Sequence, residues 1–287
     1  MHHQKHNQGH FIKITSHKTN FKNYITNMNR LKTILTFIFI SCFSVPVFGQ
    51  QFDVMVYTSP DRWHDATLPT AIQQFQKLSE QHRFGLIWAQ SDGSGSAQNP
   101  FSEEFLSGFD AVIFLHATGD DLTDDQLENF KQFIRNGGGF VGIHAASVDS
   151  GQDEWLLRLI GRAFTHHPEE QTAVYKVVDK NFPATMHLPD RWIYTGELYS
   201  FGEELTDNLN YLITVDEETY DPARTWGSGL DTSMGDFHPI AWHHEFDGGR
   251  SFYTALGHIP ASFNDPWFLA HIYGGIYWAA TGYGVYE

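Results

Sequence analysis

The sequence has one cysteine, few basic residues and no apolar run long enough to cross a membrane. Its 287 residues include 18 Lys and Arg against 34 Asp and Glu, so the formal net charge is −16 at pH 7 with histidine neutral. This charge disfavours nucleic acid and anionic membranes as partners, because both repel an acidic surface. The apolar run from Thr33 to Phe43 is shorter than the ~20 residues that a membrane-spanning helix needs.

The single cysteine, Cys42, lies in a segment with the pattern of a secretory signal peptide. Met28–Lys32 is short and basic, Thr33–Phe43 is mostly apolar, and a Val-Phe-Gly sequence directly precedes Gln50. This pattern predicts a signal peptide at residues 28–49 and cleavage before Gln50. We therefore expect export, to the periplasm or to the cell exterior.

Cleavage would leave no cysteine, which excludes a disulfide, a thiolate nucleophile and a cysteine metal ligand. It would also leave no integral membrane span. A lipoprotein acylated at Cys42 is an alternative, but Phe39 stands where such motifs usually have Leu. Residues 1–27 have no regular pattern and precede the signal, which indicates a misassigned upstream start.

The remaining segment, residues 50–287, has the length of one large α/β domain. It carries 12 basic and 34 acidic residues, a net charge of −22. We find no linker, repeat or low-complexity stretch in its second half, so we expect a single domain. The sequence leaves the oligomeric state open.

Short apolar runs alternate with amphipathic helical patterns in the first half of this segment. Helices are predicted from Thr67 to His82 and after Thr123, which forms a capping box with Gln126. Such alternation is typical of a doubly wound α/β fold with a mainly parallel sheet. The apolar runs predict strands at residues 52–58, 84–89, 111–115 and 139–143.

After Gly161 the pattern becomes polar, aromatic and rich in strand signals. An apolar helix from Pro266 to about Thr281 ends the chain. We interpret this half as a β-rich C-terminal elaboration of the same domain. Its predicted strands are at residues 171–179, 211–215, 240–244 and 250–256.

Histidines follow four of the predicted strands. His64 and His116 follow the first and third strands, His144 follows the fourth, and His258 follows the late strand at 250–256. Ligands of open parallel sheets bind where the carboxyl ends of the strands meet. Imidazole binds metals or transfers protons. One such histidine is most simply structural, but four at one edge predict a functional site.

His144 lies at the apex of the stretch Gly142–Ala146, which has the pattern of a nucleophile elbow. A glutamine amidotransferase needs a cysteine at this apex, so that activity is excluded. Ser147 is a conceivable nucleophile, although a turn or helix-cap role is more ordinary for serine there. No Gly-x-Gly-x-x-Gly follows any strand, so no nucleotide is expected.

Several stretches match the motifs of one family, over nearly all of the segment from Val54 to Thr281. They are Gly137–Ala146, His64, Thr118–Asp120, Phe164 with His167, Pro168 and Gln171, Glu197 with Tyr199, Asp216–Glu217 with Tyr220, His238–Pro239 with Trp242, Gly248–Arg250, Phe252–Thr254 and Leu256–His258. On these residues the sequence resembles the ThuA-like family, named for trehalose utilisation. The resemblance implies a flavodoxin-like sheet of the class I glutamine amidotransferase type.

The sequence departs from the family pattern at three places. Val148 stands where the family usually has Asp, with Asp149 next to it. Gly196 replaces the Asp that usually precedes the motif glutamate, and His116-Ala117 replaces the usual Asn-Thr. These changes put a carboxylate-dependent step in doubt at the first two positions.

The resemblance implies saccharide catabolism, with keto-disaccharides or glycosides as substrates, by metal- or histidine-assisted hydrolysis or elimination. Aromatic residues make up 15% of the chain, which suits stacking on sugar rings. The alternative is a carbohydrate-binding module without catalysis.

Candidate residues fall into three groups. The predicted catalytic residues are His144, His258 and Glu197. A divalent metal, zinc by preference, is expected to bind some of His64, His144, Glu197 and His258, because imidazole with carboxylate suits zinc. The predicted substrate contacts are Arg62, Trp63, His116, Asp120, Tyr199, Trp242 and Tyr253.

Overall fold

The computed structural model describes residues 49–59, 62–91, 100–148, 151 and 153–285. The predicted signal peptide with Cys42, and the extension at residues 1–27, lie outside the described residues. The helices and strands are β1 (Asp53–Thr58), α1 (Leu68–His82), β2 (Gly85–Gln90), α2 (Glu103–Leu106), β3 (Ala111–Leu115), α3 (Asp124–Arg135), β4 (Gly139–Ile143), η1 (His144–Ser147), α4 (Glu154–Ile160), β5 (Phe164–His166), β6 (Gln171–Val177), β7 (Arg191–Gly196), β8 (Ser200–Phe201), β9 (Asn210–Asp216), η2 (Glu217–Thr219), β10 (Pro239–Phe246), β11 (Gly249–Thr254), η3 (Ser262–Asn264) and α5 (Pro266–Thr281).

Nine strands form one sheet in the order β2-β1-β3-β4-β11-β10-β9-β6-β7. The first five run parallel, and each of the last four is antiparallel to its neighbours. The order 2-1-3-4 is that of a flavodoxin-like sheet. The predicted doubly wound fold with a β-rich elaboration is therefore confirmed. Two further strands, β5 and β8, pair with each other.

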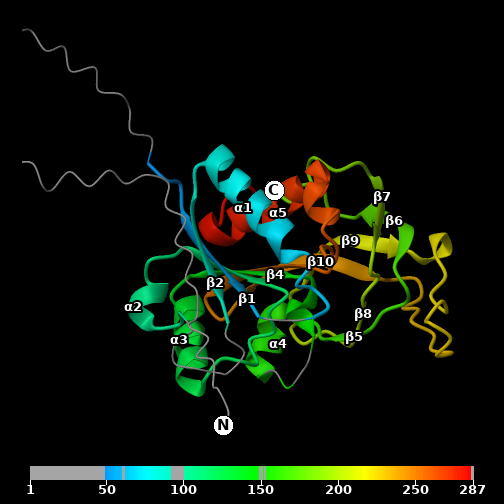
Figure 1. Cartoon of the computed structure of the whole chain (residues 1–287), viewed down its shortest axis with the longest axis horizontal. Helices are drawn as coiled ribbons and strands as arrows, with labels where there is room; N and C mark the ends of the chain where they lie inside the picture. The colour runs from blue at the N-terminus through cyan, green and yellow to red at the C-terminus, as the bar shows by residue number, and fades with distance from the viewer. Residues whose placement is uncertain (1–48, 60–61, 92–99, 149–150, 152, 286–287) are drawn as a thin grey trace, which may run out of the picture.

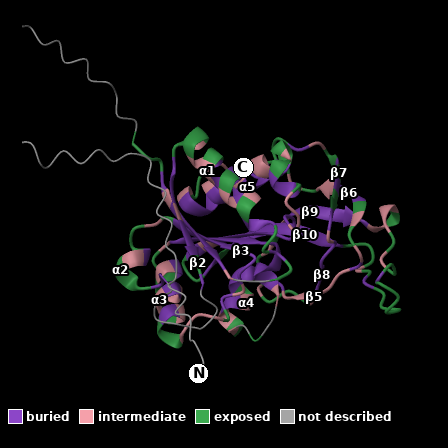
Figure 2. Cartoon of the chain, in the orientation of Figure 1, coloured by how far each residue is buried: buried purple, intermediate pink, exposed green. Residues whose placement is uncertain are grey.

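Helices cover both faces of the parallel strands. In Figure 1, α1 and α5 lie on one face and α2, α3 and α4 on the other. All residues of β3 and β4 are buried, and Figure 2 shows the central strands in purple throughout. A strand covered on both faces has no polar side, which explains why these runs are continuously apolar.

Local signals placed most elements correctly. β3, β4 and α5 have the predicted bounds. The capping box of α3 is present, since Gln126 donates its N–H to Thr123 Oγ1 at 3.3 Å and the Thr123 N–H donates to Gln126 Oε1 at 2.9 Å. Eight elements were not predicted, and six of them have four residues or fewer, which is too short for a recognisable periodicity. The eight are α2, α4, β5, β7, β8, η1, η2 and η3.

Helix α5 lies directly on the strands that hold two of the strand-end histidines. A Cβ on Gly139 of β4 would lie 2.2 Å from the Ala279 carbonyl oxygen of α5. A Cβ on Gly275 of α5 would lie 2.3 Å from the Phe252 ring of β11. Only glycine permits this close approach, which fixes β4 and β11 against the helix and thereby the start of the loops that follow them.

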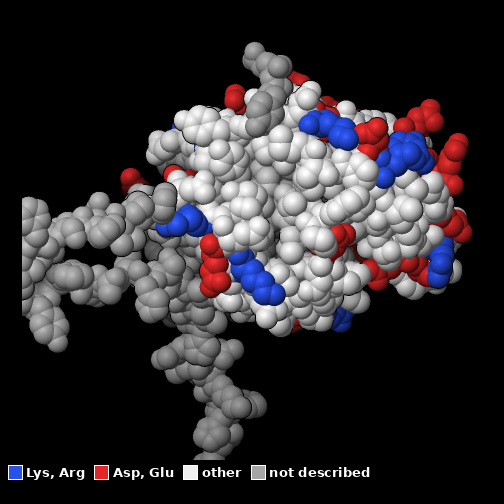
Figure 3. Space-filling view, turned by 90° about the horizontal axis from the view of Figure 1, so that it is seen from above, with Lys and Arg blue, Asp and Glu red and all other residues white. Residues whose placement is uncertain are grey.

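No helix among the described residues is both long and apolar enough to span a membrane. On the face shown in Figure 3, basic side chains are scattered among acidic ones, mostly toward the margins. This face therefore offers no continuous basic surface.

Three buried histidines make the stability of the fold sensitive to acid. Burial lowers the pKa of His271 to about 3 and the pKa of His243 and of His244 to about 4, from an ordinary value of 6.5. The unfolded chain therefore binds protons below pH 6.5 that the folded chain does not. We expect the free energy of unfolding to fall as pH drops from 6.5 toward 4, by up to ~1.4 kcal/mol per pH unit for each histidine.

Urea unfolding at pH 7, 6 and 5 measures this effect, because few carboxyl groups titrate in that interval. Replacing His271 by Gln removes one titrating group, and we expect the pH slope to become shallower in that variant. An unfolding free energy that is equal at pH 7 and pH 5 would contradict the assignment of these histidines as buried and neutral.

Candidate functional site

A cavity of about 1010 Å³ opens at the carboxyl ends of the parallel strands. This edge is the expected ligand site of an open parallel sheet. The volume lies at the upper end of the ~300–1,000 Å³ typical of small-molecule pockets. The residues that line it are Ser59, Trp63, His64, His116, Thr118, Asp120, Ala145, Val148, Phe164, His167, Glu169, Glu170, Glu197, Tyr199, Trp226 and His258.

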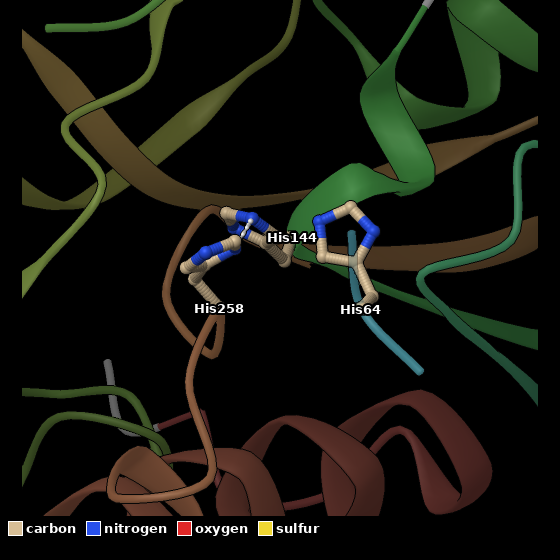
Figure 4. A group of neighbouring side chains, drawn as sticks. All are labelled: His64, His144 and His258. Atoms are coloured by element: carbon tan, nitrogen blue, oxygen red, sulfur yellow. Dashed lines mark hydrogen bonds between the residues drawn. The ribbon is translucent and has the colours of Figure 1, made fainter. Parts of the chain in front are cut away.

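Three of the strand-end histidines, His64, His144 and His258, point toward one another (Figure 4). His64 and His258 line the cavity, whereas His144 is fully buried beside them and does not line it. The ring centroids of His144 and His258 are 5.1 Å apart. The ring centroid of His64 lies 5.1 Å from that of His144 and 5.3 Å from that of His258. One ring nitrogen from each histidine lies within 4.8 Å of the other two. The loops after β1, β4 and β11 thus bring together residues up to 194 positions apart in the sequence.

The backbone is strained where this cluster is built. His144 begins η1 directly after β4 with φ of 55°, the sharp strand-to-helix turn of an elbow. Among the described residues, five other than glycine have positive φ, and three of them belong to the site: His116, His144 and Trp226. Such conformations cost ~1–3 kcal/mol each and persist where the surrounding structure imposes them.

Hydrogen bonds orient the His144 ring. Its Nδ1 lies 2.7 Å from the Ala255 carbonyl oxygen, which only accepts, so Nδ1 carries a hydrogen. Its Nε2 faces the Tyr199 hydroxyl at 2.9 Å and Glu197 Oε2 at 3.3 Å. A histidine held in this way presents Nε2 to the cluster, which is the usual arrangement for a metal-binding or proton-accepting histidine.

The His258 ring completes the arrangement. Its Nε2 lies 3.3 Å from Glu197 Oε1, so it donates to the carboxylate, and its Nδ1 lies 3.2 Å from Nε2 of His144. Two ring nitrogens that face each other at this distance repel unless a proton or a cation lies between them. The cluster can therefore hold a proton or a cation between these two nitrogens.

Two of the three glutamates that line the cavity, Glu170 and Glu197, have pKa values shifted in opposite directions. Burial by itself would raise the pKa of Glu197, but the hydrogen bond from His144 and the nearby imidazoles lower it to about 2. The pKa of Glu170 is raised by burial and by the charge of Glu197. Burial, and then His144, lower the pKa of His258 to about 4. Two carboxyl groups with pKa values shifted in opposite directions are typical of acid and base pairs.

His116 lies beside the cluster rather than in it. Its ring stacks on His64 with a centroid distance of 4.4 Å and an interplanar angle of 7°. Burial lowers its pKa well below the ordinary value, and neither ring nitrogen has a hydrogen-bond partner among the described residues. A buried polar atom without a partner is costly, so the ring has hydrogen-bonding capacity available to a ligand or to water.

Three other predicted contacts also line the cavity: Trp63, Asp120 and Tyr199. Tyr199 packs its ring 4.3 Å from that of His144. Arg62 is exposed and does not line the cavity, but its guanidinium lies over the Trp63 ring, 4.4 Å from the centroid. Arg62 is thus placed to act on a ligand only through the tryptophan.

Two predicted substrate contacts, Trp242 and Tyr253, do not line the cavity, because both side chains are fully buried. Trp242 packs in the core and donates its Nε1–H to the Ile160 carbonyl oxygen at 2.7 Å. Tyr253 donates its hydroxyl to the His144 carbonyl oxygen at 2.8 Å and pairs with Ser147 Oγ at 2.7 Å. Both Tyr253 and Ser147 brace the elbow, so the contacts of Ser147 fit the turn role expected for a serine there.

Nine residues that line the cavity were not among the predicted site residues, and three of them, His167, Glu170 and Trp226, bear on its chemistry. His167 Nε2 lies 3.7 Å from Glu197 Oε2, and its ring lies 5.5 Å from that of Trp226. Glu170 lines the same wall. His167 belongs to one of the family-like stretches and Trp226 is an aromatic of the β-rich half, so only their spatial position was missing from the sequence.

One of the departures from the family pattern lies in the cavity wall. Val148 lines the cavity, so an apolar side chain stands where the family usually has a carboxylate. Its neighbour Asp149 lies outside the described residues. Gly196 is buried and precedes Glu197, which supplies the carboxylate that contacts the histidines.

Fold and site together define a doubly wound α/β protein with a histidine-rich site and no cysteine at its elbow. The chain belongs to the ThuA family, described as trehalose utilisation, which matches residues 53–279. The family ties the protein to carbohydrate metabolism. No curated protein matches the chain.

Two solved structures show the same fold. A ThuA-like protein from Bacteroides uniformis is 21% identical with a TM-score of 0.67, over 81% of this chain and 92% of that one. A ThuA-like protein from Parabacteroides merdae is 20% identical with a TM-score of 0.63, over 82% of this chain and 92% of that one. Both agree with a flavodoxin-like sheet and a β-rich elaboration.

Proposed function

We propose that this protein is an enzyme that cleaves the glycosidic bond of a keto-disaccharide or keto-glycoside. The observation that supports the proposal is the convergence of four residues: His64, Glu197 and His258 line one large cavity, and the buried His144 contacts them. Four groups able to hold a cation or move protons, gathered where ligands of this fold bind, are more than a sugar-binding surface needs.

The residues suit a divalent metal, zinc by preference. His64, His144 and His258 each offer a ring nitrogen to a common point, and the 3.2 Å between two of these nitrogens is close to the ~3.4 Å that Zn–N bonds of ~2.1 Å give in a tetrahedral site. Glu197 holds His258 from behind or serves as a further ligand. When bound, the metal would supply a positive charge that polarises the substrate carbonyl.

In a 3-keto sugar the carbonyl is at C3 and the glycosidic oxygen is at C1. The carbonyl makes the C–H bond at C2, between them, acidic. In the proposed reaction a base of the cluster, His258 or Glu197, takes this proton, and the C–H electron pair forms a C=C bond. The glycosidic C–O bond then breaks, and the leaving oxygen takes a proton from an acid such as Glu170 on the cavity wall. His144, with Nδ1 fixed by Ala255, directs Nε2 toward the carbonyl oxygen or the cation.

Incubation with trehalose, maltose, cellobiose and their 3-keto derivatives, followed by product analysis, tests the proposal. The assay is run with and without added zinc, manganese or cobalt. We expect cleavage of at least one keto-disaccharide. If the protein binds a sugar and leaves it intact through long incubation, it is the carbohydrate-binding module and the enzyme proposal fails.

We propose further that the active form is exported and begins at Gln50. The support is the basic and apolar pattern of residues 28–49. The intact mass of protein recovered from its native host tests this: a mature form that retains residues 28–49 would contradict cleavage.

A further inference from the structure

Two tryptophans are exposed and yet line the cavity. Trp63 is 68% and Trp226 67% exposed. Tryptophan is highly buried on average, because its large apolar ring gains much from leaving water. Two exposed indoles contribute little to folding, so their place at one cavity points to a ligand that covers them.

The structure around Trp226 holds its backbone in place. Its backbone has φ of 50°, a left-handed conformation that is rare for a bulky residue. The Trp226 N–H donates to Glu169 Oε1 at 3.0 Å, and Arg224 Nε donates to Glu169 Oε2 at 2.8 Å. The Glu169 N–H in turn donates to the Arg224 carbonyl oxygen at 2.8 Å. The chain thus fixes a strained residue that stays 67% exposed, which is typical of a functional position.

The histidine cluster connects the two indoles. Trp63 directly precedes His64, whose ring lies 5.1 Å from that of His144. On the other side, Glu197 contacts both His144 at 3.3 Å and His167 at 3.7 Å. His167 presents its ring edge-on to Trp226 at 5.5 Å. The two indoles therefore stand at opposite ends of a line of contacts that passes through the cluster.

The charge of the cavity wall limits which ligands fit. The charged side chains that line it are Asp120, Glu169, Glu170 and Glu197, and no Lys or Arg is among the described lining residues. Arg224 offsets only Glu169. A phosphate or carboxylate on the ligand would meet this acidic wall, and no Lys or Arg among the described lining residues would pair with it.

We propose that the cavity binds an uncharged saccharide of at least two rings, with one ring stacked on Trp63 and the other on Trp226. The flat apolar face of a sugar ring gains by covering an indole, while its hydroxyl groups bond the polar wall. The linkage between the rings then lies over the histidine cluster. This inference rests on the proposed function for the choice of a saccharide as ligand.

Calorimetric titration with the neutral disaccharides trehalose, maltose and cellobiose and their 3-keto derivatives tests the inference. The variants are Trp63→Ala and Trp226→Asn, since asparagine tolerates the left-handed backbone. Trp267→Ala is the matched control, because Trp267 is 43% exposed but lies outside the cavity. We expect Kd to rise about tenfold in each of the first two variants, and to stay unchanged in the control.

Two further ligands complete the test. Methyl glucoside, with one sugar ring, is expected to bind more weakly than the disaccharide and to lose affinity in only one of the two variants. A disaccharide that carries a glucuronate is expected to bind at least tenfold more weakly than its neutral counterpart. If Trp226→Asn fails to fold, Trp226→Phe, which keeps a smaller ring, is expected to raise Kd by less than tenfold.

Failure of this inference is distinct from failure of the proposed function. Tryptophan-dependent binding without conversion of the sugar supports the two-ring site and contradicts the enzyme. Conversion with affinity unchanged in both variants overturns the two-ring site and leaves the enzyme. Tighter binding of the glucuronate than of the neutral sugar, or no binding of any neutral disaccharide, also overturns the inference.

Discussion

Replacement of His144 by alanine is expected to lower turnover by about 100-fold or more, as loss of a positioned acid, base or metal ligand does. The His144 ring contacts four groups of the site. Its Nδ1 donates to the Ala255 carbonyl oxygen, and its Nε2 faces Tyr199, Glu197 and His258. Its removal leaves the other groups without a common partner. Steady-state kinetics on the substrate identified by product analysis measures the loss.

Two further variants separate chemistry from folding. His144→Asn keeps a residue that tolerates φ of 55°, so it is expected to fold even if alanine at this buried turn does not. His187→Ala removes an exposed histidine outside the cavity and is expected to keep full turnover. A folded His144→Ala protein with full turnover would remove His144 from the mechanism, and with it the reason to place the chemistry after β4.

Protein purified without an affinity tag is expected to contain about one equivalent of zinc, and a chelator is expected to lower turnover by 100-fold or more until zinc is restored. The reason is that three imidazole nitrogens within 4.8 Å of one another form a donor set that suits zinc. Metal content by elemental analysis and metal affinity by calorimetry measure the site independently of turnover.

A pair of variants makes the metal test specific. His64→Gln removes one of the three nitrogens and is expected to weaken zinc binding by at least the ~10–100-fold that follows loss of an outer-shell partner. His167→Gln changes a cavity histidine outside this group of three and is expected to bind zinc nearly as well. Absence of bound metal, with no gain of activity on addition of zinc, manganese or cobalt, would reject the metal. His144 and His258 would then be an acid and base pair that acts directly on the sugar.

The sequence by itself determined the five parallel strands and the helices α1, α3 and α5. The bounds of β3, β4 and α5 and the capping box at Thr123 follow from interactions within a few residues, so local apolar periodicity and polar spacing are enough to find them. It also determined the edge of the sheet where the histidines meet. Parallel strands in a doubly wound sheet end at a common edge, so residues that follow different strands are brought together by topology alone.

The tertiary structure decided which polar and aromatic residues reach that edge. Trp226 and Trp242 are both tryptophans of the β-rich half, but only Trp226 is exposed. Trp242 lies on β10, which has a strand on each side of it in the sheet. Trp226 lies in a left-handed turn, and its N–H donates to Glu169. Likewise, Glu197 meets His144 and His258 only through pairings between segments more than 50 residues apart. Burial and hydrogen-bond partners depend on which distant strands become neighbours, and no local pattern in a single sequence specifies that.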